Sequence, residues 1–186
     1  MSLIARIIAE DAVAMEQLRA VRSLGLPDWC IAAGFVRNRV WDHLHGYACP
    51  TPVADVDVAF FDPDDLRRER EEAIERELFT LRGDVPWDVK NQAAVHCWYE
   101  TVFGVAVPPL TSIEDAVSSW PETATCVAVR LQTDGDLLVL APHGLDDLFQ
   151  LLLRWNPRRS TLELFRRRVR EKEIERKWPR VRILEG

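Results

Sequence analysis

The sequence predicts one domain of the α/β (α+β) class, in which strands and helices follow one another along the chain. The length of 186 residues suits a single domain, since most domains have about 100–150 residues. The hydrophobic fraction of 47% and the charged fraction of 29% are those of a soluble globular protein and exclude a disordered, collagen-like or disulfide-rich chain. Apolar residues recur at three- and four-residue steps in some segments, and alternate or run continuously in others, which predicts helices and strands respectively.

This periodicity assigns the elements in chain order. They are a helix over residues 3–24, a strand over 29–33, a helix over 35–45, a strand over 55–61, a helix over 63–81, a strand over 85–91, a helix over 92–103, a helix beginning near 112, a hairpin over 125–142, a helix over 144–155 and a basic C-terminal helix over about 160–178. We expect a single domain over residues 1–186, with its core at about 28–156.

Glycine and proline set the boundaries in the first part of the chain. Gly25 and Pro27 end the first helix, and Gly46 is expected to cap the helix that follows residue 34. Pro50 and Pro52 separate that helix from the next strand, because proline is poorly tolerated inside either element.

Capping residues predict where two later helices begin. Asp62–Pro63 suits an N-cap followed by the first helical position. Thr111 with Glu114, or Ser112 with Asp115, satisfies the spacing of a capping box. Both alternatives remain open from the sequence.

Turn and cap signals also organise the last third. Asp134–Gly135 suits the tight turn of a hairpin. Asn156–Pro157 ends the helix over 144–155, Ser160 with Glu163 begins the last helix, and Pro179 closes it.

The charge is divided along the chain. Residues 154–186 hold 12 Lys and Arg against 5 Asp and Glu, whereas residues 1–153 hold 12 against 25. The C-terminal helix is therefore expected to be a solvated basic helix, and a phosphate-rich partner such as RNA remains open.

The sequence indicates neither a membrane protein nor a protein whose cysteines bind a metal or form disulfides. No apolar run approaches the ~18 residues of a membrane span, and the N-terminal segment carries acids where a signal peptide needs an apolar core. We expect a cytoplasmic protein. The cysteines are scattered without a CxxC pair, so neither a zinc site nor a disulfide framework is predicted.

The segment DVDVAFFD, residues 55–62, carries the main chemical signal. Side chains alternate along a strand, so Asp55 and Asp57 share one face with their Cα atoms about 6.6 Å apart. Two such carboxylates repel each other unless a cation lies between them. Mg²⁺ prefers oxygen ligands and is commonly held by one or two carboxylates plus substrate phosphates. The alternative is an acidic edge strand with both side chains in water.

Two further segments support a nucleotide site. Gly34 follows a strand and begins a helix, where free N–H groups and the helix dipole favour a phosphate. Arg37 and Asn38 follow it and could reach phosphates. Asp88 lies in a further extended segment and supplies a third carboxylate, which can accept the proton of an attacking hydroxyl. Lys90 shares the face of Asp88 and could steady a phosphate or neutralise the acidic cluster.

Structural roles are expected for other polar and aromatic residues. Arg130, in a strand of the hairpin, could bind a triphosphate or form a cross-strand ion pair, and the ion pair is favoured. The seven tryptophans are assigned mostly to the core. His96 and Cys97 are neighbours on a helix and do not face each other, so no thiol–imidazole pair is predicted.

The ordered segments AAGFVRNRVWDHLHG, DVDVAFFD, WDVKNQAAVH, SSWPETATCVAVRL and APHGLDDLF together resemble a bacterial family of nucleotidyltransferases, which is distantly related to the DNA polymerase β superfamily. The resemblance covers the chain from Cys30 to about Asn156. It implies a mixed β-sheet flanked by helices, with a glycine loop at the nucleotide phosphates and metal ligands on adjacent strands.

By position, Gly34 matches the phosphate-loop glycine, Asp55 and Asp57 match the metal pair, and Asp88 matches the third carboxylate. Two features depart from the superfamily pattern. Phe35 follows the glycine where Gly or Ser is usual, and the interval from Gly34 to Asp55 is longer than usual.

We therefore expect an enzyme that uses Mg²⁺ or Mn²⁺ to transfer a nucleoside monophosphate from a nucleoside triphosphate (NTP) to an acceptor hydroxyl, with release of pyrophosphate. The alternative is a catalytically weak nucleotide-binding or interaction module on the same fold, which Phe35 and the long interval favour. The acceptor could be a small molecule, RNA or a protein, and the sequence gives neither base preference nor oligomeric state.

Overall fold

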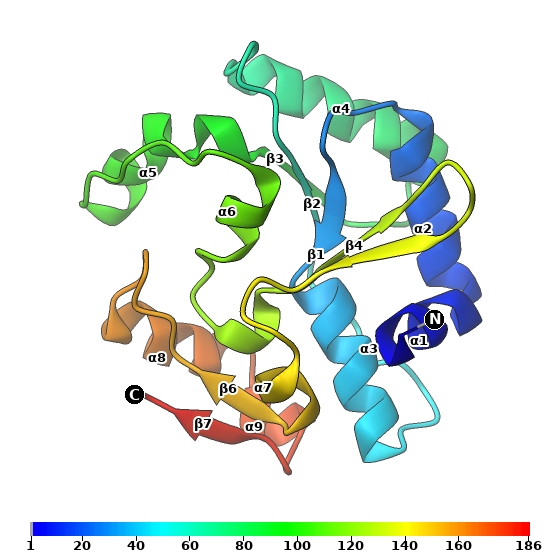
Figure 1. Cartoon of the computed structure of the whole chain (residues 1–186), viewed down its shortest axis with the longest axis vertical. Coiled ribbons are helices and arrows are strands. Elements are labelled where there is room, and N and C mark those ends of the chain that lie inside the picture. The colour runs from blue at the N-terminus through cyan, green and yellow to red at the C-terminus, as the bar shows by residue number, and fades with distance from the viewer. Residues whose placement is uncertain (1) are drawn as a thin grey trace.

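The computed structural model describes residues 2–186, in which helices and strands follow one another as the periodicity predicts (Figure 1). In chain order the elements are α1 (Leu3–Glu10), α2 (Ala12–Ser23), β1 (Cys30–Ala32), α3 (Gly34–His45), β2 (Val56–Phe60), α4 (Arg68–Leu81), β3 (Trp87–Asn91), η1 (Gln92–Ala94), α5 (Val95–Phe103), α6 (Ile113–Val117), η2 (Thr123–Thr125), β4 (Ala128–Leu131), β5 (Leu137–Leu140), α7 (Asp146–Phe149), β6 (Leu152–Arg154), α8 (Leu162–Glu171), α9 (Ile174–Lys177) and β7 (Arg182–Leu184).

A five-stranded sheet in the order β3-β2-β1-β4-β5 forms the centre of the molecule. Strands β2 and β3 are parallel, while the other neighbouring strands are antiparallel. The sheet is therefore mixed, as the family resemblance implies. A separate pair of short parallel strands, β6 and β7, lies near the C-terminus.

The two faces of this sheet have different partners. Helices α1 to α4 contribute to one large apolar core together with sheet residues such as Ile31, Val58 and Val129. On the opposite face, Ile113 and Val117 of α6 pack against β1 and β4. Because side chains alternate along β2, its valines enter the large core and Asp57 lies on the face of α6.

The C-terminal segment is docked on α3. Trp178, which is 1% exposed, donates a 2.7 Å hydrogen bond from Nε1 to Oδ1 of Asp42. Its ring meets that of Trp41 edge to face, with centroids 5.3 Å apart. The basic C-terminal segment is thus part of the packed domain, and the expectation of a solvated basic helix is wrong for its inner face.

Several predicted boundaries are confirmed by backbone geometry. Gly46 caps α3 with a φ of 70°, and Gly135 has a φ of 93° in the β4–β5 turn. Ser112 accepts a hydrogen bond from the Asp115 backbone N–H, which selects the second of the two capping alternatives.

Two helices of the first half differ from the prediction. The first helix is two helices, because the Asp11 side chain accepts hydrogen bonds from backbone N–H groups of α2 and ends α1. Helix α4 begins at Arg68, so the prediction that Asp62 caps it before Pro63 is wrong. The Asp62 carboxylate instead accepts from the Asp64 N–H in a local turn.

Two helices of the last third also differ. Only residues 146–149 of the segment 144–155 are helical, because Leu151 has a φ of 57° and the chain then forms β6. The last helix is capped by Thr161, not by Ser160, and it is interrupted at Glu173, where φ is 51°. The first of these errors arises because residues 152–154 pair with β7.

Other expectations concern single residues. Arg130 pairs at 2.9 Å with Asp28, just before the neighbouring strand β1. All four cysteines are free, and Cys30 and Cys126 are buried. Within residues 2–186, no helix is both long and apolar enough to cross a membrane.

Candidate active site

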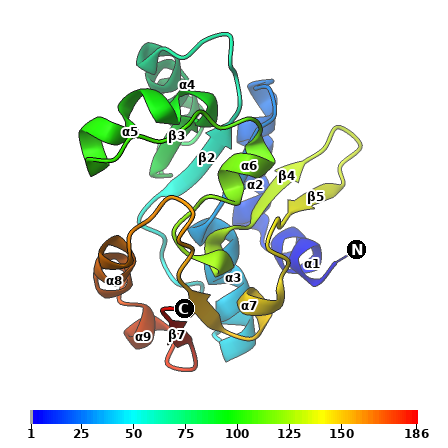
Figure 2. The same ribbon diagram turned by 60° about the vertical axis from the view of Figure 1, so that its left-hand side comes forward.

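A cleft of about 400 Å³ lies over β2 and β3, on the face of the sheet that carries Asp57. The start of α3, the two strands, α5 and α8 all contribute residues to it. Figure 2 places α5 and α8 on the same side of the molecule, one above the other, with α6 nearer the sheet. The cleft thus joins segments from the first, middle and last thirds of the chain.

The acidic wall of the cleft consists of Asp55, Asp57 and Asp88. Asp57 and Asp88 are register partners in the parallel β2–β3 pair, so their side chains lie on the same side of the sheet. Asp55 precedes β2 by one residue and shares that side. Burial, and then the charges of Asp55 and Asp88, raise the pKa of Asp57 to about 6.

Asp88 has a cationic partner within the strand. The Lys90 ammonium lies 2.5 Å from Oδ1 of Asp88 and 3.9 Å from Oε1 of Glu75. Lys90 thus neutralises the acidic wall, which is one of the two roles that the sequence left open. Among residues 2–186, no group of three His, Cys, Asp or Glu side chains stands ready at metal-binding geometry.

The acidic wall nevertheless has the chemistry of a site for Mg²⁺ or Mn²⁺. Its donors are carboxylate oxygens, which hard divalent cations prefer. The raised pKa of Asp57, caused by burial and by neighbouring carboxylates, shows that negative charge is concentrated where a cation would relieve it. Asp55 and Asp57 would hold the cation, and Asp88 could join them on release from Lys90.

The start of α3 provides an open helix N-terminus at the cleft. Ala33 precedes the helix with a φ of 52° and a ψ of −116°, and no side chain caps the helix. A Cβ atom at Gly34 would lie 3.9 Å from Oδ1 of Asn38 and 4.0 Å from Nη2 of Arg37. Internal packing therefore does not require glycine here, whereas a close phosphate would. Phe35 is fully buried in the large core, so it does not obstruct the cleft.

Arg37 and Asn38 are less available than the sequence suggested. Arg37 is 4% exposed and Asn38 is 6% exposed, and Nη2 of Arg37 donates to Oδ1 of Asn38 at 2.8 Å. The Arg37 guanidinium also lies 5.2 Å from the ring centroid of Trp41 and 5.3 Å from that of Trp178. Arg37 lines the floor of the cleft, while Asn38 holds its guanidinium in place.

The basic wall of the cleft consists of Arg168 of α8 and Lys172, the C-cap of that helix. Nε of Arg168 lies 2.6 Å from Oε1 of Glu122, which is 2% exposed. The Lys172 ammonium forms no ion pair with a described residue. Burial, and then the charges of Arg168 and Arg37, lower the pKa of Lys172. Lys172 is thus a half-buried cation that lines the cleft without a carboxylate partner among the described residues.

Sequence reasoning missed the basic wall and Glu122. The spacing of Arg168 and Lys172 shows that they share a helix face, but so do other basic residues of α8. No local pattern indicates which face of α8 lies toward the aspartates, because long-range packing, including that of Trp178 on α3, sets the orientation of this helix. Glu122 lies in the segment SSWPETATCVAVRL, but no local spacing indicates its pairing with Arg168.

An open groove continues from the cleft along α5, the segment 104–109 and the start of α8. The cleft and this groove share Tyr99, Phe103, Arg159, Leu164 and Arg167. The rings of Tyr99 and Phe103 lie with centroids 4.5 Å apart. The cleft is therefore open at an aromatic and basic end.

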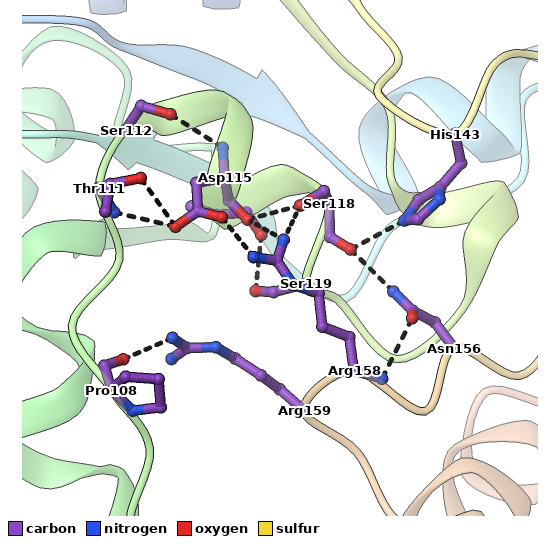
Figure 3. Close-up of polar contacts among 11 residues, drawn as sticks. Pro108, Thr111, Ser112, Asp115, Ser118, Ser119, His143, Asn156, Arg158 and Arg159 are labelled. Carbon is purple, nitrogen blue, oxygen red and sulfur yellow. Dashed lines mark hydrogen bonds and ion pairs between the residues drawn. The ribbon is translucent and has the colours of Figure 1, made fainter.

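The walls of this groove are tied together by polar contacts. Figure 3 shows the Arg158 guanidinium bonded to Asp115 and Ser118. Arg159 donates to the carbonyl oxygen of Pro108. Asn156 donates from Nδ2 to the Ser118 carbonyl oxygen at 2.9 Å. These bonds fix the turn before α8 to α6 and so fix the position of the basic wall.

Known proteins resemble this chain over most of its length. The model of a family described as nucleotidyltransferase matches residues 19–183. A structure determined by NMR and described as a CCA-adding enzyme head domain is 31% identical, with 98% of this chain and 95% of that chain covered and a TM-score of 0.83.

Two longer solved structures share the fold. A CCA-adding enzyme in complex with CTP is 15% identical with a TM-score of 0.59, and an apo tRNA-processing enzyme is 17% identical with a TM-score of 0.54. They are covered over 44% and 43% of their own lengths, by 100% and 93% of this chain respectively. No protein with a curated description matches. From the family match and the head-domain relative together, the chain belongs to the nucleotidyltransferases.

Proposed function

We propose that the protein transfers a nucleoside monophosphate from an NTP to an acceptor hydroxyl, with Mg²⁺ or Mn²⁺ at the acidic wall. The observation that carries the proposal is the register pairing of Asp57 with Asp88, beside Asp55 and opposite a wall of cations. The family and the similarity to a CCA-adding enzyme head domain support an NTP as the donor.

The chain's own residues divide the work between donor and acceptor. The free N–H groups at the start of α3 hold the phosphate chain, and Gly34 lets it approach closely. Lys172 balances the charge of the outer phosphates, while Arg168, paired with Glu122, holds the basic wall in place. When bound, the divalent cation would neutralise negative charge at the α-phosphate and so lower the barrier to the displacement of pyrophosphate from it.

The reaction exchanges one phosphorus–oxygen bond for another. The acceptor oxygen forms a bond to the α-phosphorus as the bond from that phosphorus to the β-phosphate oxygen breaks, and pyrophosphate leaves with the electron pair. A carboxylate oxygen of Asp88 receives the proton of the acceptor hydroxyl. Positioning and electrostatic stabilisation supply most of the rate in such transfers.

The acceptor is expected to enter along the groove lined by Tyr99, Phe103 and Arg159. Aromatic rings beside arginine suit an unpaired nucleotide, and the similar head domain is described as that of a CCA-adding enzyme. The 3′-hydroxyl of an RNA is therefore the first acceptor to test, ahead of small molecules and proteins.

The test is pyrophosphate release from labelled NTPs with RNA extracts as acceptor. We expect Asp57→Asn to lower turnover at least about 10³-fold, because charge stabilisation at the α-phosphate is lost. Asp64→Asn changes an exposed carboxylate outside the cleft and should have no effect. Unchanged turnover in Asp57→Asn would contradict the proposal. Cation-dependent NTP binding without pyrophosphate release, whatever the acceptor, would favour the catalytically weak module.

A further inference from the structure

We propose that Lys90 is an exchangeable counter-ion of the acidic wall, which a divalent cation must displace from Asp88 and which Glu75 then receives. This inference rests on the proposed function, because it concerns the cation that the function requires. It assigns Lys90 the role of a positioning residue that sets how tightly the cation is held.

The geometry places one ammonium between two carboxylates. Lys90 lies on the edge strand β3, and its Nζ is 2.5 Å from Oδ1 of Asp88 and 3.9 Å from Oε1 of Glu75. The Lys90 side chain is 40% exposed, so its four-carbon stem has room to move. A small shift therefore transfers the ammonium from one carboxylate to the other.

Glu75 is a fixed receiver for this charge. Its Oε1 accepts a 3.0 Å hydrogen bond from the Val89 N–H, and Oε1 of Glu71 accepts a 2.7 Å bond from the Asn91 N–H. Both glutamates come from α4 and cover outward N–H groups of the edge strand. Glu75 therefore keeps its place whether or not Lys90 moves.

The same Asp88 oxygen cannot serve the ammonium and a divalent cation at once. While the Lys90 ammonium is paired with Asp88, this carboxylate cannot bind a cation together with Asp55 and Asp57. In agreement, residues 2–186 contain no group of three His, Cys, Asp or Glu side chains arranged to hold a metal ion. The ammonium also offsets repulsion among the three carboxylates. Lys90 thus stabilises the cleft before the cation binds and weakens the binding of that cation.

The direct test measures Mn²⁺ binding to the full chain without nucleotide, by electron paramagnetic resonance of free Mn²⁺. Lys90→Met should tighten binding about tenfold, because a competing positive charge is removed. Lys90→Gln keeps a hydrogen-bond donor without charge and should tighten it similarly. Arg76→Met removes an exposed charge from α4 and should leave the dissociation constant unchanged.

A double-mutant cycle separates exchange from plain electrostatics. Glu75→Gln should weaken Mn²⁺ binding about threefold, because Lys90 loses its second site and stays on Asp88. In the Lys90→Met background, Glu75→Gln should have no effect. An effect of Glu75→Gln that persists in that background would overturn the exchange.

Unfolding curves give a second measurement. Without Mn²⁺, Lys90→Met should unfold at a lower temperature than the unaltered chain, and saturating Mn²⁺ should reverse that difference. Equal Mn²⁺ affinity in both chains, or no binding by either, would overturn the inference. Nucleotide transfer, together with equal Mn²⁺ affinities of the unaltered chain and Lys90→Met, would overturn the inference and leave the proposed function intact. Tighter Mn²⁺ binding by Lys90→Met without nucleotide transfer by the unaltered chain would support the inference and contradict the function.

Discussion

The two walls of the cleft carry opposite charge and are built differently. The acidic wall comes from adjacent strands, where Asp55 and Asp57 are two residues apart and Asp88 is set beside them by strand register. The basic wall comes from the C-terminal half of α8 and its C-cap, at least 80 residues later along the chain. It reaches the cleft because Phe165 and Val169 of α8 pack in the large core, and because Trp178 docks on α3. A local pattern thus makes one wall, and long-range packing makes the other.

The cations of the basic wall also differ from one another. Arg168 is bonded to buried Glu122, whereas Lys172 has no such partner among the described residues. Arg168 therefore holds the wall in place, and Lys172 is available to a ligand. Charge alone does not distinguish them, but their partners do.

The strongest way to break the basic wall is to remove its buried partner. Glu122→Gln should lower the free energy of unfolding by about 3 kcal/mol, because Arg168 is left without its buried carboxylate. Urea denaturation measures it. The matched control is Glu185→Gln, which removes the partner of Arg166 on the same helix, where both side chains are exposed. That change should leave the free energy of unfolding nearly unchanged, because exposed ion pairs contribute little, and equal losses in the two variants would contradict the difference.

The acidic wall should reveal itself in the pH dependence of stability. The pKa of Asp57 is raised to about 6, first by burial and then by Asp55, so the folded chain holds this proton more tightly than the unfolded chain. The contribution of Asp57 to the free energy of unfolding should therefore fall by about 3 kcal/mol as pH rises from about 4 to about 6, and then level off.

Thermal unfolding of Asp57→Asn across this pH range isolates that contribution. The variant should lack the decline and should be more stable than the unaltered chain at pH 7, while Asp64→Asn should keep the decline. A decline of the same size in Asp57→Asn would show that another group causes it. Mg²⁺ at neutral pH should recover part of the lost stability in the unaltered chain only.

The smallest effect is expected at the free cation of the basic wall. Lys172→Ala should weaken NTP binding about tenfold, or about 1.4 kcal/mol, because the outer phosphates lose one charged contact. Calorimetric titration measures this change. Arg170→Ala removes an exposed charge from the same helix and should leave NTP binding unchanged; equal weakening in both variants would indicate only the net charge of α8.

Much of the fold was predictable where local signals act within one element. The β1–Gly34–α3 order, the two-residue period of DVDVAFF and the Asp134–Gly135 turn are confirmed by the structure. The prediction failed where a distant partner overrode local preference. Residues 152–154 have helical periodicity but pair with β7, and residues 63–66 follow a good N-cap but lie in turns around the Asn91 side chain.

The sequence by itself determined which residues could carry the chemistry of the acidic wall, because strand alternation fixes the face of Asp55 and Asp57 without reference to the rest of the chain. Only the tertiary structure decided that Asp88 stands beside Asp57, that Lys90 holds Asp88, and that Lys172 faces them across the cleft. The physical reason is range: side-chain direction within an element follows from backbone periodicity, whereas the meeting of charges from three distant segments depends on the packing of the whole core.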